Sequence, residues 1–253
     1  MDLPRNHFKA AIRSGRHQLG FWCSLPGGYA AELVAGSGYD WLLFDTEHSP
    51  SDPIGVLEQL QAVAPYDVSA VVRPASNDPV LIKRILDVGA QTLLVPYVQS
   101  REEAEAAVAA MRYPPRGIRG VSGLTRATRF GRIPGYAKRA ESELCLLVQV
   151  ETGLALDRLE EIASVDGVDG VFIGPADLAA SLGYPGEPDH PDVAAAVENA
   201  ISRLKVLGKP AGILTANNTF ARRCIEIGTL FTAVGIDAGI LARGSEALAK
   251  SFR

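Results

Sequence analysis

The chain has 253 residues, of which 47% are hydrophobic and 21% are charged, a balance typical of a soluble globular protein. A formal net charge of −4 gives no reason to expect binding to nucleic acid or to an anionic membrane. Barrels of this length routinely form one domain with a core that needs no disulfides, so we expect a single domain over residues 1–253.

The cysteines and the N-terminal segment predict an intracellular setting. Cys23, Cys145 and Cys224 are too few and too scattered for a disulfide framework or a zinc site, and the first two lie in apolar runs typical of buried thiols. Residues 1–16 predict an amphipathic helix and lack the apolar stretch of a signal peptide. No apolar run approaches the roughly eighteen residues of a membrane span. We therefore expect a cytoplasmic protein.

Eight short apolar runs recur along the chain and predict strands. Most of them alternate too little to be half-exposed, which is typical of parallel strands that are buried on both faces. In chain order the runs cover residues 19–24, 41–45, 70–73, 92–96, 144–150, 170–173, 211–214 and 231–235.

Helical patterns fill the gaps between these runs. Asp78 followed by Pro79 predicts an N-cap and a proline at the first helical position. Ser100 and Glu103 form a capping box that opens an alanine-rich helix ending at Met111. Three glycines stand where helices are expected to stop: Gly36, Gly89 and Gly228.

Eight strand–helix units in about 250 residues predict a single-domain α/β protein with the (β/α)8 or TIM-barrel fold. A doubly wound open sheet is the alternative. No G-x-G-x-x-G pattern follows the first predicted strand, so a nucleotide-binding crevice of that kind has no support.

One long segment, residues 113–136, interrupts the rhythm of strands and helices. A loop of this length inside a compact domain is usually functional or covers another part of the protein. It carries five arginines and no acidic residue: Arg116, Arg119, Arg126, Arg129 and Arg132.

Polar side chains gather where four of the predicted strands end. In a (β/α)8 barrel the active site is built at the C-terminal ends of the strands. The motifs FDTEHSP, VVRP, LVQVET and FIGPAD place there, in chain order, Asp45, Glu47, His48, Arg73, Gln149, Glu151 and Asp177.

Glu151 and Asp177 follow consecutive predicted strands, which lie about 4.8 Å apart in a parallel sheet. Two carboxylates without a neighbouring His or Cys form an all-oxygen set that suits Mg²⁺ or Mn²⁺, with water and substrate completing the coordination. The alternative is that each carboxylate caps a helix or pairs with an arginine.

His48 has the residue type that moves protons near neutral pH, and Asp45 is a carboxylate that can orient it. The alternative for this segment is a solvated turn. Arg73 suits an oxyanion or a carboxylate, unless it serves only to pair with Asp45 or Asp87. No lysine lies at a C-terminal strand end, which argues against Schiff-base chemistry.

These motifs resemble the class II, pyruvate-dependent 4-hydroxy-2-oxoheptanedioate (2,4-dihydroxyhept-2-ene-1,7-dioate) aldolase family of aromatic catabolism. The resemblance runs over nearly the whole chain. Besides the strand-end motifs, it rests on NDPVLIKRILDVGAQTLLVP, YPPRGIRGV and GVDGVFIGPADLA. Sugar-acid aldolases and macrophomate synthase share this site, so the choice within the family stays open.

The resemblance implies a role for each of the candidate site residues. Glu151 and Asp177 would hold one divalent ion per subunit (Mg²⁺, Mn²⁺ or Co²⁺), which chelates the keto and carboxylate oxygens of pyruvate, and no organic cofactor is implied. The substrate-binding residues would be Gln149, Ala176 and Asp177. The catalytic residues would be His48 as the base with Asp45 near it, Arg73 beside the enolate oxygen, and Asp87, which raises the basicity of the histidine.

The implied reaction is reversible cleavage of a 4-hydroxy-2-oxo acid to pyruvate and an aldehyde, and the implied assembly is a homo-hexamer, often a trimer of dimers that exchange the last helix. Arg126 or Arg129 would meet the distal carboxylate of an acidic aldehyde, unless the loop is a solvated face or a subunit contact. Two other functions remain: a metal-dependent decarboxylase of oxaloacetate, and a non-catalytic barrel.

Overall fold

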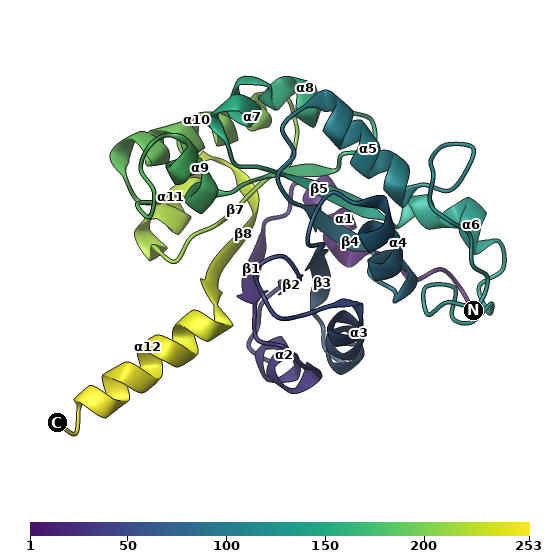
Figure 1. The fold of residues 1–253 in the computed structure, drawn as a ribbon, viewed down its shortest axis with the longest axis horizontal. Coiled ribbons are helices and arrows are strands. Elements are labelled where there is room, and N and C mark those ends of the chain that lie inside the picture. The colour runs from purple at the N-terminus through teal and green to yellow at the C-terminus, as the bar shows by residue number, and fades with distance from the viewer.

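The computed structural model describes residues 1–253 as eight parallel strands that close into a barrel (Figure 1). The strands follow one another in chain order, and β8 pairs with β1 to complete the closure. The predicted (β/α)8 barrel is confirmed, and the alternative of an open sheet is wrong. The strands are β1 (Gln18–Cys23), β2 (Trp41–Asp45), β3 (Ser69–Arg73), β4 (Thr92–Val95), β5 (Cys145–Val150), β6 (Gly170–Ile173), β7 (Ala211–Leu214) and β8 (Thr229–Ile236).

Helices connect the strands and begin where the sequence predicts. Asp78 caps α4, since its carboxylate accepts from the backbone N–H groups of Val80 and Leu81. The capping box before α5 is only half formed: Ser100 accepts from the N–H of Glu103. The helices are α1 (His7–Arg13), α2 (Gly28–Ala35), α3 (Pro53–Ala62), α4 (Pro79–Asp87), α5 (Arg101–Met111), α6 (Tyr136–Arg139), α7 (Gly153–Asp157), α8 (Leu159–Ala163), α9 (Pro175–Ser181), α10 (Pro191–Val206), α11 (Asn218–Ile227) and α12 (Asp237–Lys250), with a 3-10 turn η1 (Ala140–Ser142).

Two hydrophobic cores follow from the two buried faces of the strands. One cluster of 48 buried residues contains strand residues together with residues of the surrounding helices. A second cluster of 12 takes the alternate strand positions, such as Leu43, Val71 and Leu147, and fills the barrel interior. Helix α1 closes the N-terminal end of that interior, because Phe8 packs edge-on against Trp41 and Phe231 with ring centroids 5.7 Å apart in each pair.

Small residues in the barrel wall make room for these aromatic rings. A Cβ atom at Gly20 would lie 2.0 Å from the Trp41 side chain, and one at Gly212 would lie 2.0 Å from the ring of Phe231. The inner faces of β1 and β7 therefore need glycine where the rings fill the barrel.

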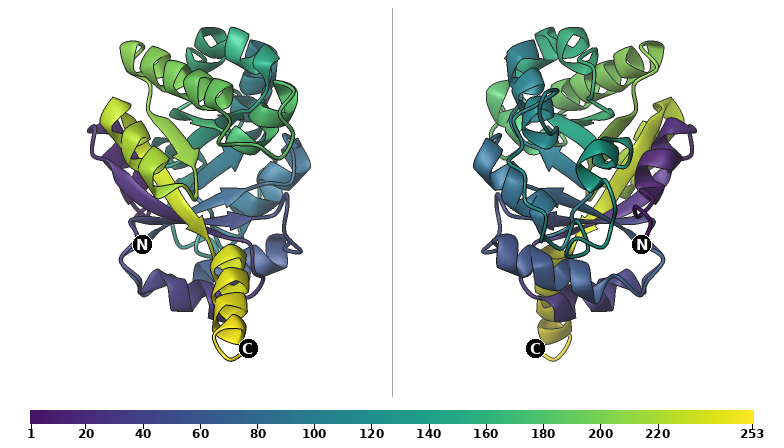
Figure 2. Two further views of the ribbon diagram at one scale, coloured as in Figure 1. Left: turned by 90° about the vertical axis from the view of Figure 1, so that its left-hand side faces the viewer. Right: turned by 90° about the vertical axis from the view of Figure 1, so that its right-hand side faces the viewer.

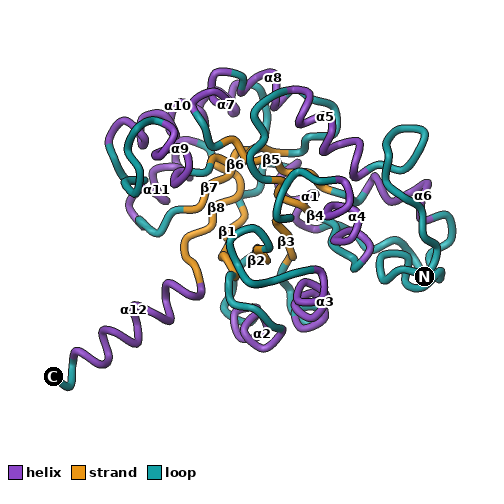
Figure 3. The backbone as a smooth tube through the Cα atoms, viewed as in Figure 1, coloured by secondary structure: helices purple, strands orange, loops and turns teal.

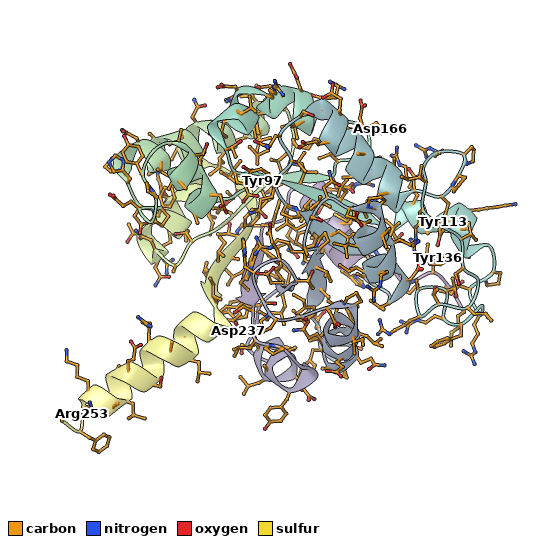
Figure 4. All side chains as sticks on the ribbon, viewed as in Figure 1. Tyr97, Tyr113, Tyr136, Asp166, Asp237 and Arg253 are labelled. Atoms are coloured by element: carbon orange, nitrogen blue, oxygen red, sulfur yellow. The ribbon has the colours of Figure 1, made fainter.

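The arginine-rich segment forms a long loop between α5 and α6, drawn in teal in Figure 3. The guanidinium of Arg119 anchors it: this side chain is fully buried, lies 4.6 Å from the ring centre of Tyr113, and donates to Asp87 at 2.9 Å. Figure 4 labels Tyr113 and Tyr136, whose rings meet edge-on beside it. The loop is thus fastened to the barrel by a buried cation.

Helix α12 extends away from the barrel in all three ribbon views (Figures 1 and 2). Asp237 holds its first turn, because the carboxylate accepts from the backbone N–H groups of Ser24 and Leu25. Figure 4 labels Asp237 at the base of the helix and Arg253 at its far end. Beyond Asp237 the helix has no buried residue.

All three cysteines are buried and unpaired, as the sequence predicts for Cys23 and Cys145. None of the helices combines the length and the hydropathy that crossing a bilayer requires.

Candidate active site

A cavity of about 470 Å³ opens at the C-terminal end of the barrel. Most of the predicted site residues line it: Asp45, His48, Arg73, Gln149, Ala176 and Asp177. The inner face of the strands explains this convergence. Asp45, Arg73 and Gln149 stand two positions beyond Leu43, Val71 and Leu147, which belong to the interior core, so the cavity is the open top of that layer.

Asp45 and Arg73 form the central ion pair of the cavity. They are register partners on the adjacent strands β2 and β3. The Arg73 guanidinium donates from Nε to Asp45 Oδ1 at 2.9 Å and from Nη2 to Oδ2 at 2.6 Å, and it lies 4.9 Å from the ring centre of Trp22. Burial alone would raise the pKa of Asp45, but the hydrogen bonds and charge of Arg73 hold that pKa below its ordinary value.

Glu47 completes the acidic surroundings of Arg73. Its Oε2 lies 2.8 Å from Arg73 Nη1 and 3.8 Å from His48 Nε2. Burial raises the pKa of Glu47, with Asp45 and Asp177 adding to the rise and Arg73 and His48 opposing it. Arg73 is therefore held from two sides by carboxylates, and its orientation at the cavity is fixed.

His48 stands at the mouth of the cavity, with 66% of its side chain exposed. Asp45 approaches only the backbone N–H of His48, at 3.5 Å, while Glu47 is the carboxylate nearest to the ring. Asp45 is the carboxylate that the sequence predicts to orient the imidazole, whereas in the structure Glu47 faces the ring and Asp45 pairs with Arg73 instead.

Glu151 lies just behind the cavity wall, where it is 2% exposed. Its Oε1 accepts from the backbone N–H of Tyr97 at 2.8 Å, and its Oε2 accepts from the side-chain amide of Gln149. Tyr97 is labelled in Figure 4. Burial raises the pKa of Glu151 to about 7, and the charges of Asp177 and Glu47 add to the rise. A cation bound nearby would favour the ionised form of this carboxyl group and so offset the cost of burying its charge.

The surroundings of Glu151 fit a divalent cation. Gln149 Oε1 is buried without a hydrogen-bond partner, so an acceptor oxygen is left over beside the carboxylates. Gly174 makes room there, since a Cβ atom at this position would lie 2.5 Å from Glu151 Oε2. No group of three or more His, Cys, Asp or Glu residues in this chain is arranged to hold a metal ion by itself. The protein can thus offer two carboxylates, with water and substrate as the remaining ligands.

Asp87 and the loop arginines lie away from this cavity. Asp87 is the last residue of α4, which runs back from the C-terminal end of β3, and its carboxylate pairs with Arg119. Arg126 donates to the backbone carbonyl of Val88 at 2.9 Å, just beyond the same helix end. Within one chain, neither Asp87 nor Arg126 nor Arg129 lines the cavity.

The side of the cavity next to β7 contains one residue, Asp189, that the strand ends in the sequence do not predict. Thr215 and Asn217 follow β7 as the strand predicts, but Asp189 comes from the connection between α9 and α10, far from any strand end. No lysine lines the cavity, which agrees with the expectation that Schiff-base chemistry has no place here.

A second, more open depression of about 1000 Å³ lies at the other end of the barrel, around Lys9 and Asp169. Lys9 lies 3.8 Å from Asp169, which Arg13 also contacts at 2.9 Å. This end carries paired charges at the entrances of the strands, and none of the predicted site residues lies there.

The chain is similar in sequence and structure to aldolases. The model of the HpcH/HpaI aldolase/citrate lyase family matches residues 18–243. A pyruvate aldolase of Rhizobium etli is 73% identical over 252 residues, which cover 100% of this chain and 99% of that protein. A 4-hydroxy-2-oxo-heptane-1,7-dioate aldolase of Salmonella heidelberg is 57% identical over 249 residues, with 98% of this chain and 95% of that protein covered.

A solved structure shows the same barrel. The HpcH/HpaI aldolase/citrate lyase family protein of Burkholderia cenocepacia J2315 superposes with a TM-score of 0.93 at 38% identity, covering 98% of this chain and 99% of that one. The relatives named aldolases are carbon–carbon lyases, so the resemblance predicted from the strand-end motifs is confirmed. The chain belongs to the HpcH/HpaI aldolase/citrate lyase family and is an enzyme of the aldolase type.

Proposed function

We propose that this protein is a divalent-metal-dependent pyruvate aldolase that reversibly cleaves 4-hydroxy-2-oxo acids, such as 4-hydroxy-2-oxoheptanedioate, to pyruvate and an aldehyde. One observation carries the proposal: Arg73, His48 and Asp177 meet at one cavity, with the buried Glu151 directly behind its wall. The names of the two relatives support the choice of substrates.

Glu151 and Asp177 are the proposed ligands of one metal ion per subunit, for which Mg²⁺, Mn²⁺ and Co²⁺ are the candidates. When bound, this ion supplies positive charge beside the keto oxygen on which the enolate charge develops. The proposed contacts to pyruvate come from Gln149 and from Ala176 and Asp177 at the start of α9. No organic cofactor is proposed.

Arg73 is proposed to stabilise the enolate oxygen of pyruvate. Its guanidinium is already oriented by Asp45 and Glu47, so no reorganisation is needed when the charge appears. In the cleavage direction a base takes the proton of the 4-hydroxyl group, the C3–C4 bond breaks, and its electron pair enters the enolate. Breaking of this bond frees the aldehyde, and the enolate then takes a proton at C3 and becomes pyruvate.

His48 is the proposed base. It stands at the cavity mouth with Glu47 beside its ring, so the carboxylate can stabilise the imidazolium that proton transfer creates. Asp45 is proposed to act on His48 through the backbone and through Arg73. Asp87 of the same chain is the last residue of α4, at the end of the helix far from the cavity, where it pairs with Arg119. A role for Asp87 in raising the basicity of His48 would therefore require the Asp87 of a neighbouring subunit.

The proposed assembly is a cytoplasmic homo-hexamer in which α12 packs on a neighbouring subunit, with residues 1–253 forming one domain. The support is the apolar side chains that α12 exposes, Ile240, Leu241 and Leu248. A helix that extends away from its own barrel with such residues needs a second surface to bury them (Figure 1).

The test is pyruvate release from 4-hydroxy-2-oxoheptanedioate by chelator-stripped protein, with and without added Mg²⁺, Mn²⁺ or Co²⁺. We expect release to return with metal, and to stay absent in Glu151→Gln while Glu161→Gln, an exposed residue of α8, behaves as the wild type. Substantial release without metal would exclude the Glu151 and Asp177 assignment. Pyruvate from oxaloacetate alone would favour the decarboxylase, since the same groups can hold an enolate formed by loss of CO₂.

A further inference from the structure

The wall of the active-site cavity next to β7 combines apolar residues with three polar side chains and carries no cation. Asp189, Thr215 and Asn217 line it, together with Phe220. The cavity has only two cationic or potentially cationic side chains, Arg73 and His48, and both stand on the opposite side after β3 and β2. If pyruvate lies at Gln149, Ala176 and Asp177 as proposed, the part of a substrate that extends away from it would meet this wall.

Asn217 fixes the position of Asp189. Its Oδ1 accepts from the backbone N–H groups of Thr219 and Phe220, both at 3.1 Å, as the N-cap of α11. Its Nδ2 donates to Asp189 Oδ1 at 3.2 Å. The two bonds to the helix N-terminus fix the side-chain amide of Asn217, and this amide in turn holds the carboxylate of Asp189 at the cavity mouth.

The carboxylate of Asp189 is exposed, has the neutral amide of Asn217 as its side-chain partner, and meets no Lys or Arg on this side of the cavity. The hydroxyl group of Thr215 can still donate a hydrogen bond to a ligand, because its Oγ1 only accepts, from the backbone N–H of Asn217 at 3.1 Å. This wall therefore offers an anionic acceptor and a hydroxyl donor, and it offers no cation to balance the charge of an anionic ligand.

Arg73 cannot serve the far end of an acceptor. Its guanidinium is bound by Asp45 through two nitrogens and by Glu47 through the third, within the strand layer at the base of the cavity. A second carboxylate at the distal end of an aldehyde would thus meet the charge of Asp189, and no cation of the same chain stands beside Asp189 to compensate for it.

We propose that the aldehyde partner of this aldolase is uncharged and hydroxylated, that Asp189 is the residue which disfavours acceptors with a distal carboxylate, and that Thr215 and Asn217 receive the hydroxyl groups. The inference rests on the proposed function and narrows its preferred substrates to 4-hydroxy-2-oxo acids whose aldehyde half is neutral. The same site then cleaves 4-hydroxy-2-oxoheptanedioate, which yields succinic semialdehyde, but less efficiently. A site that hydrogen-bonds a substrate hydroxyl group discriminates against the analogue that lacks it.

The first test measures kcat/KM for aldol addition of pyruvate to glyceraldehyde and to succinic semialdehyde, using metal-loaded protein. In Asp189→Asn we expect the kcat/KM for succinic semialdehyde, divided by that for glyceraldehyde, to rise about fivefold. This is the effect of removing one like charge at about 4 Å in water. The rise is expected to shrink at high ionic strength. Glu187→Gln, which removes a charge from the same connection outside the cavity, is expected to leave the ratio unchanged.

The second test compares glyceraldehyde with propanal, which lacks the hydroxyl groups. In Thr215→Val we expect the preference for glyceraldehyde to fall about fivefold, the worth of one hydrogen bond, while Thr219→Val, outside the cavity, keeps it. Unchanged ratios in Asp189→Asn and Thr215→Val, in proteins that still catalyse aldol addition, would overturn this inference alone. A wild-type protein without addition to any aldehyde would overturn the proposed function and this inference with it.

Discussion

Asp45 is a buried carboxylate that pairs with Arg73, so its contribution to stability can be measured separately from its proposed part in the chemistry. Replacing it in Asp45→Asn leaves the Arg73 guanidinium, which is 6% exposed, with Glu47 as its only anionic partner. Because hydrogen bonds to charged groups contribute about 1.5–3 kcal/mol, we expect the free energy of unfolding at pH 7 to fall by about that amount. Urea denaturation measures it, and Asp67→Asn, at an exposed position, is the matched control.

The pH dependence of this loss has a definite sign. The pKa of Asp45 is lower in the folded protein than its ordinary value, so the stabilisation is complete above about pH 4 and is lost as the pH falls through the folded-state value. The difference in unfolding free energy between wild type and Asp45→Asn should accordingly narrow below about pH 4. A difference that stays constant down to acid unfolding would contradict this account.

His48 presents the opposite case, a side chain with a proposed catalytic role and little part in folding. Because 66% of it is exposed, His48→Ala should change the free energy of unfolding by no more than about 0.5 kcal/mol. Loss of a general base should lower kcat by about 10²–10⁴. Steady-state kinetics measures the loss of kcat, and a denaturant unfolding curve measures the change in stability. His7→Ala in α1 serves as the control for both. Near-normal turnover in His48→Ala would exclude the histidine as the base.

At the scale of the elements, the turn between β6 and α9 has to leave space for Glu151 and Gln149. A methyl group at Gly174 would lie 2.5 Å from Glu151 Oε2 and 2.9 Å from Gln149 Nε2, whereas the backbone there has a φ of −95°, which alanine adopts readily. We expect Gly174→Ala to fold and to bind Mn²⁺ at least tenfold more weakly, as titration calorimetry would measure. Gly153→Ala, with 3.6 Å to its nearest neighbour, is the control; equal affinities would refute the assignment.

The strands were predictable from the sequence because their signals are local. Buried runs such as 41–45 and 170–173 have the bounds of β2 and β6, and the caps at Asp78 and Ser100 begin α4 and α5. The capping box failed in its second half, where the Glu103 carboxylate accepts from Gln99 instead of Ser100. That choice depends on side-chain placement, which the motif does not determine.

The arginine-rich loop could be located from the sequence, but the contacts of its arginines could not. Arg119 enters the interior between two tyrosines and pairs with Asp87, while Arg126 reaches the carbonyl of Val88. The contacts with Asp87 and Val88 span 32 and 38 residues of the chain and exist only once α4 has packed on the barrel. The idea that Arg126 or Arg129 meets an aldehyde carboxylate has no support within one chain.

At the scale of the whole molecule, α12 is the element that its own barrel does not cover (Figure 2). If a neighbouring subunit buries it, Leu241→Glu with Leu248→Glu should shift the protein from hexamers to smaller species at micromolar concentration. The barrel should keep its unfolding transition in dilute solution. Sedimentation velocity measures the oligomeric state of the double variant, and Lys250→Glu, at the end of the same helix, is the control. An unchanged hexamer would show that α12 is not the contact.

The sequence by itself determined the barrel and the residues that its strand ends present. These properties follow from periodic burial and from the alternation of side chains, which act over a few residues. Only the tertiary structure decided that Glu47 faces the ring of His48, that Asp87 lies away from the cavity, and that Asp189 stands in its wall. The physical reason is that each of these placements depends on helices and connections that pack against the strands, and no local pattern records that packing.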